Sequence, residues 1–174
     1  MSAAEASVID MTTSDTISTP VGRLTVVSDG ASITRVAWRS APPPKDDSAQ
    51  DPVLAEALRQ LRAYFDGRLA RFDVPFDLGR QTEVTRAVLT ALAETVGHGE
   101  SVTYGELAAR SGTSIPARGV GAVMGANPVP IIVPCHRVVA SDGLGGYSGG
   151  DSGQGLVTKR WLLEFEGALP TALF

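Results

Sequence analysis

Residues 103–126 read TYGELAARSGTSIPARGVGAVMGA and predict two helices joined by a short turn. Thr103 and Glu106 have the spacing of a capping box, in which the Thr hydroxyl caps the first turn and the Glu side chain reaches back. We expect this helix to end at Arg110. A Ser-Gly-Thr turn follows, and Ser114 can cap the second helix. This succession is typical of the helix-turn-helix motif.

The second helix of this pair carries almost no side chains. Small residues fill it at Ala117, Gly119, Gly121, Ala122, Gly125 and Ala126. Each interior Gly costs about 1 kcal/mol relative to Ala, so either close packing against another helix or entry into a narrow groove must explain them. A helix that reads the major groove of DNA would carry several Arg, Asn or Gln side chains, whereas this one carries only Arg118. A smooth helix with one cation suits the minor groove.

The first half of the chain predicts a small α+β domain. Residues 16–27 and 32–39 alternate enough to be strands, and Asp29-Gly30 between them is a hairpin turn signal. An apolar stripe predicts a helix from Asp51 to Gly67. A short third strand is expected over residues 72–76, where Phe72, Val74 and Phe76 alternate with Asp and Pro.

We therefore expect an α+β protein in three segments. Residues 1–15 are small and polar and predict a disordered tail, residues 16–79 form the N-terminal α+β domain, and residues 80–170 form a mainly helical C-terminal domain. The C-terminal domain is expected to open with a helix from Thr82 to Val96. The Pro-rich stretch 41–47 predicts a loop within the N-terminal domain.

Composition limits the function classes. The chain has 174 residues, one cysteine and a net charge of −4. One cysteine excludes an internal disulfide and fits a reducing compartment, so we expect a cytoplasmic protein. No apolar run is long enough to span a membrane, the N-terminus has no signal-peptide pattern, and no Cys/His cluster predicts a metal site. Because the charge is negative, any binding to nucleic acid must depend on a few well-placed cations and on shape.

Cys135 and His136 stand side by side in the segment Pro134-Cys-His-Arg-Val138. A thiol is a strong nucleophile only as thiolate, which an adjacent base or cation favours. His136 is the base candidate and Arg137 the adjacent cation. The alternative is an inert core cysteine at the end of an apolar strand, which is common.

Five blocks of sequence resemble, in the same order, the O6-alkylguanine-DNA alkyltransferases, which move an alkyl group from guanine onto their own cysteine. The blocks are Val102–Arg110, Ala117–Asn127, Asn127–Val139, Gly146–Gly150 and Lys159–Gly167. The N-terminal 80 residues resemble the family only loosely. The resemblance implies an RNase H-like N-terminal domain and a winged helix-turn-helix in the C-terminal domain.

The resemblance also implies catalytic roles. Cys135 is the nucleophile and His136 takes its proton, while Glu166 orients His136. Asn127 tethers the turn before the cysteine, although a plain helix C-cap would also explain it. Tyr104 donates its phenol proton to guanine N3, although a packed Tyr is the alternative. The family's acid directly precedes a Gly, so Glu166 is chosen and Glu164 is expected to be a surface charge.

A recognition helix in the minor groove and a lesion pocket are implied as well. An Arg, here Arg118, fills the gap left by a flipped base. The residues expected to contact DNA are Thr103, Ala117, Arg118, Gly121 and Ala122. Those expected to line the lesion pocket are Met124, Pro130, Val138, Tyr147 and Ser148.

The implied reaction is that of a methylated-DNA–protein-cysteine S-methyltransferase (EC 2.1.1.63). It acts once on O6-alkylguanine, and on O4-alkylthymine, in double-stranded DNA. We expect a monomer that needs no cofactor and no metal. Three features depart from the family: residues 151–155 are an insertion after the pocket loop, residues 84–89 lack the Phe and Trp usual at the start of this half, and Gly125 stands where an Arg is frequent.

Three other classes of protein are compatible with part of this sequence. A papain-like hydrolase would also use Cys, His and an acid, but such enzymes place the His far from the Cys in sequence. A non-catalytic lesion-binding protein of the same fold is the principal alternative, and its members lack the cysteine that this chain keeps. A cysteine-switch transcription factor would need a second DNA-binding domain, for which the N-terminal 80 residues leave no room.

Overall fold

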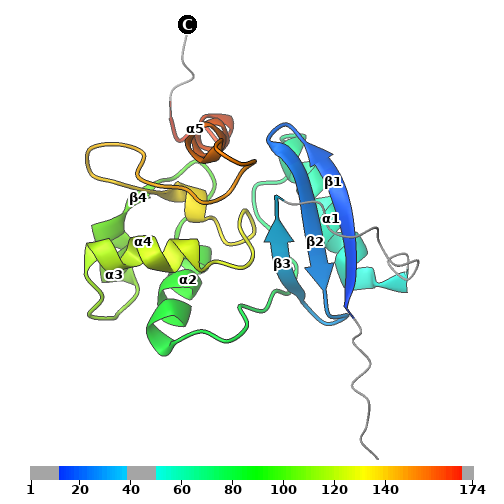
Figure 1. Cartoon of the computed structure of the whole chain (residues 1–174), viewed down its shortest axis with the longest axis horizontal. Helices are drawn as coiled ribbons and strands as arrows, with labels where there is room; N and C mark the ends of the chain where they lie inside the picture. Colours follow the sequence, from blue (N-terminus) through cyan, green and yellow to red (C-terminus); the bar gives the residue numbers. More distant parts are fainter. Residues whose placement is uncertain (1–11, 39–49, 170–174) are drawn as a thin grey trace, which may run out of the picture.

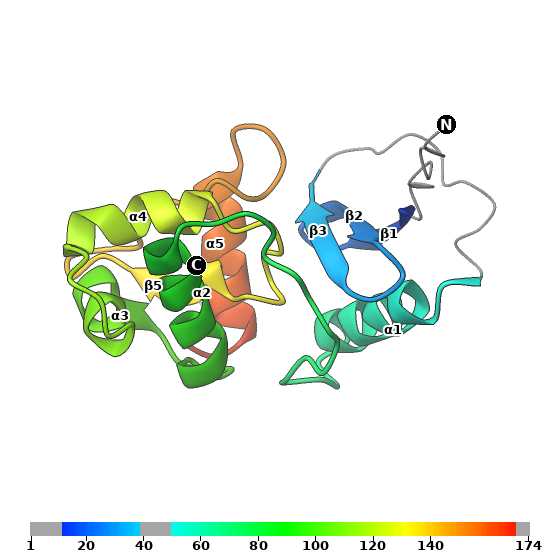
Figure 2. The ribbon, with the colours of Figure 1, turned by 90° about the horizontal axis from the view of Figure 1, so that it is seen from below.

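The computed structural model describes residues 12–38 and 50–169. Two domains lie side by side: a small sheet with one helix, and a cluster of helices (Figures 1 and 2). The α+β class expected from the sequence is confirmed. The loop expected over residues 41–47 and most of the expected tail lie outside the described residues.

The sheet of the N-terminal domain is an antiparallel meander in the order β1-β2-β3. Its strands are β1 (Thr13–Thr19), β2 (Gly22–Ser28) and β3 (Ile33–Ala37). The single strand expected over residues 16–27 is wrong, because the chain reverses between β1 and β2. Gly22 has a φ of 108°, a backbone conformation that glycine adopts readily and other residues rarely adopt. Its carbonyl accepts a 2.6 Å hydrogen bond from the Thr19 hydroxyl. The predicted boundary of the N-terminal tail at residue 15 is also wrong, because β1 already starts at Thr13.

Helix α1 (Pro52–Phe65) packs on one face of this sheet (Figure 2). Asp51 caps it by accepting hydrogen bonds from Val53 N and Leu54 N, both at 3.0 Å. Gly67 follows its end with a φ of 74°. The apolar side chains between helix and sheet are fully or nearly fully buried: Ile17, Leu24, Val26, Ile33, Val36, Leu54, Ala57, Leu58 and Leu61.

The third strand expected over residues 72–76 does not form. Only an isolated bridge joins Ile33 to Phe76. The side chain of Gln60 explains this, because it accepts from Asp73 N at 2.8 Å and donates to Asp73 O at 3.0 Å. These two bonds occupy both backbone groups of Asp73, so pairing with β3 is limited to Pro75 O, which accepts from Ile33 N, and Asp77 N, which donates to Ile33 O.

The C-terminal domain is built from short elements. They are α2 (Glu83–Thr95), β4 (Val102–Thr103), α3 (Tyr104–Arg110), α4 (Ala117–Gly125), the 3-10 helix η2 (Cys135–Arg137), β5 (Val138–Val139) and α5 (Gly155–Phe165). The expected helix from Thr82 to Val96 is confirmed, with these two residues as its caps. None of the helices within the described residues is both long and apolar enough to span a membrane.

Helices α3 and α4 form the expected helix-turn-helix. The capping box is present: the Thr103 hydroxyl accepts from Glu106 N at 3.1 Å, and the Glu106 carboxylate accepts from Thr103 N at 2.9 Å. Ser114 does not cap α4, which begins after Pro116 without a side-chain cap bond. Pro116 is the N-cap of α4 instead, with an extended backbone (φ −73°, ψ 155°).

Strands β4 and β5 bring two distant segments together. Val102 pairs with Val138 and Thr103 with Val139 in a parallel ladder. Tyr104 follows β4 directly, and Cys135 lies just before β5. This short ladder therefore fixes the start of α3 beside the cysteine segment.

Candidate active site

Cys135 lies at the start of η2, between two cavities, and its residue is 5% exposed. Both cavities, of about 1020 and 360 Å³, include it in their walls. Burial raises the pKa of the thiol above its usual value, and contributions from Asn127 and Lys159 that lower it do not compensate. The free thiol is therefore protonated at rest and needs a base in order to react.

A tight turn presents Cys135 to the cavities. Asn127 holds this turn from both sides, because its Nδ2 donates to Val133 O at 2.8 Å and its Oδ1 accepts from Val129 N at 3.0 Å. Ile131 within the turn has a φ of 73°, which is strained for a β-branched residue. Ala126, not Asn127, is the C-cap of α4, so the plain C-cap reading of Asn127 is wrong.

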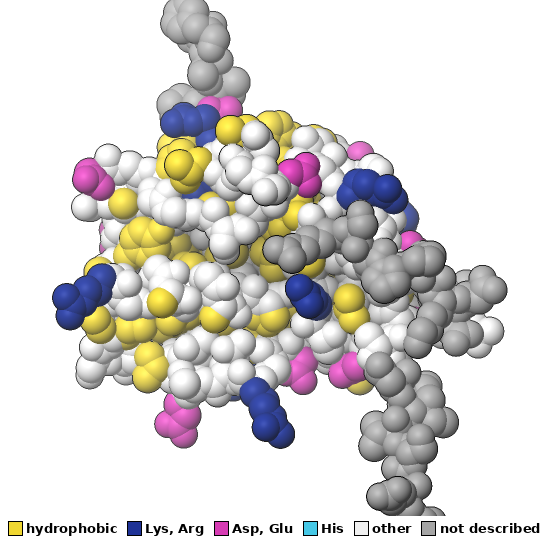
Figure 3. Space-filling view, viewed as in Figure 1, with side chains coloured by type: hydrophobic (Ala, Val, Ile, Leu, Met, Phe, Trp, Pro, Cys, Tyr) yellow, Lys and Arg dark blue, Asp and Glu magenta, His cyan; other side chains and the backbone are white. Residues whose placement is uncertain are grey.

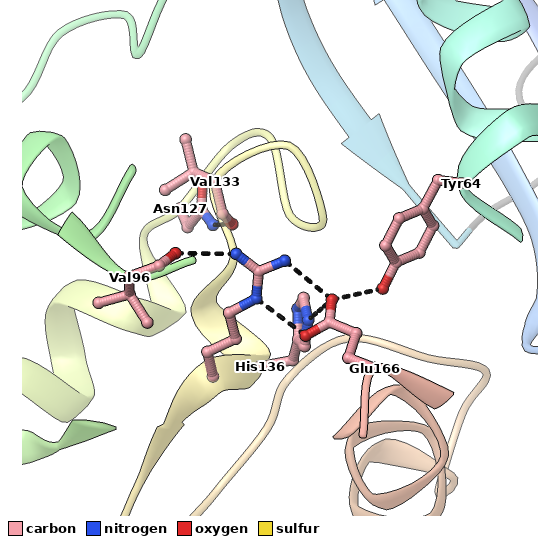
Figure 4. Close-up of polar contacts among 7 residues, drawn as sticks. Tyr64, Val96, Asn127, Val133, His136 and Glu166 are labelled. Carbon is pink, nitrogen blue, oxygen red and sulfur yellow. Dashed lines mark hydrogen bonds and ion pairs between the residues drawn. The ribbon is translucent and has the colours of Figure 1, made fainter. Parts of the chain in front are cut away.

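His136 is completely buried beside the thiol segment, and its Nε2 lies 2.8 Å from Glu166 Oε1 (Figure 4). An ionised carboxylate only accepts, so Nε2 carries the proton and Nδ1 is left as an acceptor. Nδ1 has no hydrogen-bond partner among the described residues. Burial lowers the pKa of His136 below its usual value, against the opposing effect of Glu166. The ring is therefore neutral at rest and can accept a proton at Nδ1.

Glu166 caps the C-terminus of α5 and accepts from three side chains (Figure 4). Tyr64 Oη donates at 2.6 Å and Arg137 Nη2 at 3.0 Å to the same Oε1 that contacts His136, while Arg137 Nε donates to Oε2 at 2.9 Å. Burial raises the pKa of Glu166, but His136 and Arg137 outweigh it and hold the pKa well below its usual range. The carboxylate is therefore a buried anion at neutral pH.

Glu164, the rejected alternative, lies elsewhere. It is expected to be a surface charge, and its side chain is 20% exposed, with its Oε1 3.8 Å from Nη1 of the more exposed Arg160. No hydrogen bond joins it to His136 within the described chain. The acid that directly precedes Gly167 is therefore the one that contacts the histidine.

Two cations near the site differ from the sequence expectation. Arg137, expected to act on the thiol, instead pairs with Glu166 and donates to Val96 O at 2.8 Å. Lys159 is the cation whose charge lowers the pKa of Cys135. It is fully buried, donates to Val138 O at 2.6 Å and to Gly146 O at 2.9 Å, and burial lowers its own pKa to about 8.

The smaller cavity joins the thiol to the helix-turn-helix. Its walls are Tyr104, Gly121, Met124, Gly125, Cys135, Gly146, Tyr147 and Ser148. Six of these are expected site residues, which the fold therefore brings together. A Cβ on Gly145 would lie 2.5 Å from the Tyr104 hydroxyl, so a glycine is needed for the loop to pass this ring.

The outer face of α4 is open. Ala117, Arg118, Gly121 and Ala122 are exposed, and Arg118 makes no hydrogen bond or ion pair within the described residues. Its glycines were explained either by close packing or by entry into a narrow groove, and these two explanations apply to different positions. A Cβ on Gly119 would meet Ile115 at 2.9 Å, whereas a Cβ on Gly121 or Gly125 would meet no described atom from outside its own helical turn within 4 Å.

The larger cavity lies between the domains. Its wall combines most of strand β3 and the following Trp38 with Pro130, Tyr147 and all of the inserted segment 151–155 except Gln154. The Trp38 and Tyr147 rings meet edge to face at 6.0 Å. The expected pocket residue Val138 is not in either wall, because it is buried in β5 and pairs with Val102.

The sequence reasoning missed Tyr64, Lys159 and Trp38. Tyr64 belongs to the apolar stripe of α1, so its pattern indicates only core. Lys159 is a residue type that is almost never fully buried. Trp38 stands next to the end of a strand in the other domain. The one available signal was Lys159, which begins the last of the five blocks.

Two family models match the chain in succession. The 6-O-methylguanine DNA methyltransferase ribonuclease-like domain covers residues 14–78, and the DNA-binding domain of the same proteins covers residues 83–168. The fold and the thiol site thus define a DNA-repair alkyltransferase.

Relatives and solved structures of the same family are similar to this chain over most of its length. The methylated-DNA–protein-cysteine methyltransferase of Mycobacterium tuberculosis is 42% identical over 87% of this chain and 90% of its own length. That of Rattus norvegicus is 35% identical over 89% and 81%. The crystal structure of Mycobacterium tuberculosis OGT in complex with DNA matches with a TM-score of 0.73 and 40% identity, over 88% of this chain and 91% of that one. The chain belongs to the 6-O-methylguanine DNA methyltransferase family.

Proposed function

We propose that this protein removes the alkyl group from O6-alkylguanine, and from O4-alkylthymine, in double-stranded DNA and keeps it on Cys135. The observation that carries this proposal is the position of the one thiol. It lies between a cavity beside the helix-turn-helix and a second cavity large enough for an alkyl group, next to a neutral histidine with a free acceptor nitrogen.

The chemistry follows from these positions. His136 Nδ1 takes the proton of Cys135, directly or through one water, and Glu166 stabilises the imidazolium that forms. The sulfur attacks the alkyl carbon, the carbon–oxygen bond breaks, and its electron pair stays with guanine. Tyr104 gives its proton to N3 of the leaving base and recovers one from His136. The products are a thioether and an unmodified guanine, so no cofactor is consumed.

The protein consequently acts once. The thioether has no leaving group that water could displace at neutral pH, and Cys135 is the only cysteine of the chain. Asn127 supports the reaction by holding the turn that presents the thiol.

Access to the base requires the nucleotide to leave the duplex, because O6 lies inside the base pair. We propose that the open face of α4 enters the minor groove with Ala117, Gly121 and Ala122 against the backbone walls, while Thr103 contacts the strand beside them. Arg118 then occupies the space of the flipped base. Met124, Pro130, Tyr147 and Ser148 surround the base and its substituent. One copy is enough for this arrangement.

The alternative is a protein of the same fold that binds the lesion without repairing it. A duplex carrying one O6-methylguanine with a radiolabelled methyl group separates the two. Transfer of label to the wild-type protein, with none to a Cys135→Ser variant that still binds the duplex, is the expected result. Binding without label transfer by the wild type would establish the alternative.

A further inference from the structure

Tyr64 is a residue of the N-terminal domain that reaches the reaction machinery of the C-terminal domain. It lies near the end of α1 and is 1% exposed. Its hydroxyl donates to Glu166 Oε1 at 2.6 Å, across 102 positions of sequence (Figure 4). Of the hydrogen bonds between described residues that reach Glu166 side-chain oxygens, this one alone comes from the other domain.

The bond falls on the oxygen that holds His136. Glu166 Oε1 receives Tyr64 Oη, His136 Nε2 and Arg137 Nη2 together. Donors that share one carboxylate oxygen each withdraw part of its negative charge, so each weakens its attraction for the others' protons. Burial, and then the charge of Glu166, raise the pKa of Tyr64 far above its usual value, so this hydroxyl remains a donor.

We propose that Tyr64 is a positioning residue for alkyl transfer, by which the N-terminal domain fixes the Glu166 carboxylate and limits how strongly it holds the proton of His136. This proposal rests on the proposed function, because it concerns the base of that reaction. With Tyr64 in place, the carboxylate is fixed against His136 in one orientation. The imidazole is then held neutral with Nδ1 free for the thiol proton.

The surroundings of the ring show why the position is rigid. Tyr64 contacts Phe65 at 4.9 Å, Phe72 at 5.5 Å and Phe165 at 5.6 Å between ring centroids. Phe165 belongs to α5 and directly precedes Glu166. The ring therefore cannot withdraw its hydroxyl without disturbing the helix end that carries the carboxylate.

Other titratable groups face this cluster and must be kept constant in a test. Arg137 and Cys135 lie on η2 with His136, and Lys159 lies on α5. Tyr147 faces the thiol, and His98 lies edge-on to the Tyr64 ring with centroids 6.2 Å apart. A substitution that removes only the Tyr64 hydroxyl leaves all of these in place.

The test is the rate of Cys135 alkylation by free O6-benzylguanine across pH, in the full chain. Tyr64→Phe removes one oxygen and keeps the ring. Phe65→Leu is the matched control, because Phe65 is the neighbouring residue of α1 and packs across the same interface, with its ring 6.2 Å from that of Trp161. It reduces interdomain packing but keeps the hydroxyl. Circular dichroism verifies that each variant is folded.

We expect Tyr64→Phe to slow alkylation about 10-fold, as loss of an outer partner of a catalytic group does. The rise of the rate with pH should move to higher pH, since Glu166 then holds the His136 proton more strongly. Phe65→Leu should be less stable but keep the wild-type pH profile. In a Glu166→Gln background, Tyr64→Phe should add little, because its target is gone.

Each contrary result overturns the proposal. A Tyr64→Phe profile identical to wild type would show that the bond only satisfies a buried hydroxyl. Equal changes in Tyr64→Phe and Phe65→Leu would assign the effect to packing. An undiminished effect of Tyr64→Phe in the Glu166→Gln background would exclude action through the carboxylate. Failure of the wild type itself to react would contradict the proposed function instead.

Discussion

Charge balance at Glu166 shows how single residues set the reactivity of this site. The Glu166 carboxylate, Arg137 and His136 are all buried. Three nitrogen atoms contact the carboxylate oxygens: one from His136 and two from Arg137. Removing one partner of a buried ion pair leaves the other charge without compensation. Loss of either Glu166 or Arg137 should therefore lower stability more than loss of one partner of a surface ion pair.

Glu166→Gln should lower the free energy of unfolding at pH 7.5 by about 3–5 kcal/mol, because Arg137 is left buried and unpaired. Urea unfolding measures this. An exposed control is Glu56→Gln, whose Arg59 partner is on the surface and which should change stability far less, because water and salt screen an exposed pair. Equal effects of both substitutions would contradict the buried ion pair.

The pH dependence of stability has a definite sign. The folded pKa of His136 lies below its usual 6.5, so its contribution is present above pH 6.5 and is lost as pH falls. The folded pKa of Glu166 lies below its usual 4.5, so its contribution is lost at still lower pH. Urea unfolding should show stability falling from about pH 6.5 downward, and His136→Gln should remove the first part of that fall. A flat profile between pH 7.5 and 5 in the wild type would contradict the neutral buried histidine.

Arg118→Ala should slow repair of duplex DNA about 10- to 100-fold, because an unstacked base costs a few kcal/mol that the guanidinium would help to compensate. Reaction with free O6-benzylguanine should be nearly unchanged, since Arg118 is exposed on α4 and does not line either cavity. Single-turnover rates with both substrates measure this. Equal losses on both would exclude the arginine from base flipping.

At the scale of elements, α4 serves two purposes along its length. Gly119 packs against Ile115, while Gly121 and Gly125 face open space. Gly121→Ala should therefore raise the free energy of unfolding by up to about 1 kcal/mol, through helix propensity alone. Gly119→Ala should gain less or be destabilising, because the new methyl meets Ile115. Urea unfolding of both variants checks this contrast, and a larger gain for Gly119→Ala would contradict the packing described here.

The inserted segment 151–155 forms part of the wall of the larger cavity and reaches the N-terminal domain. The Asp151 carboxylate lies so close to Gly22 that a Cβ there would be 2.8 Å from it. The segment is rich in glycine and has little to bury, so we expect it to move aside for large substituents. Deleting residues 151–155 should slow reaction with benzyl groups more than with methyl groups, measured on matched oligonucleotides. Equal effects on both would make the segment a neutral insertion.

At the scale of the whole molecule, the surface predicts weak, sequence-tolerant binding to undamaged DNA. Cations are scattered over the face around α4 and form no continuous band (Figure 3), and the net charge is −4. About three to five phosphate contacts would give a log–log salt slope of roughly −3 to −4. Titrations of a fluorescent duplex at several salt concentrations measure the slope. A value near −8 would reveal a basic surface on another face.

Local sequence patterns predicted part of the fold and of the site but not the contacts between distant segments. Asp51, Thr103 and the Cys135–His136 pair were predictable because each acts on residues within a few positions. Placing Glu166 near His136 needed the family resemblance. The bond from Tyr64 to Glu166 depends on how two domains dock, and no short pattern encodes that. The strand predicted over residues 72–76 also failed for a non-local reason, because the Gln60 side chain occupies both backbone groups of Asp73.

Intact mass spectrometry before and after incubation with a duplex containing one O6-methylguanine tests the central claim most directly. We predict that the protein gains the mass of one methyl group in place of one hydrogen, once per molecule, and that peptide mapping places it on Cys135. The duplex should be left with guanine. No mass gain, continued turnover beyond one equivalent, or a methyl group on any other residue would contradict the account.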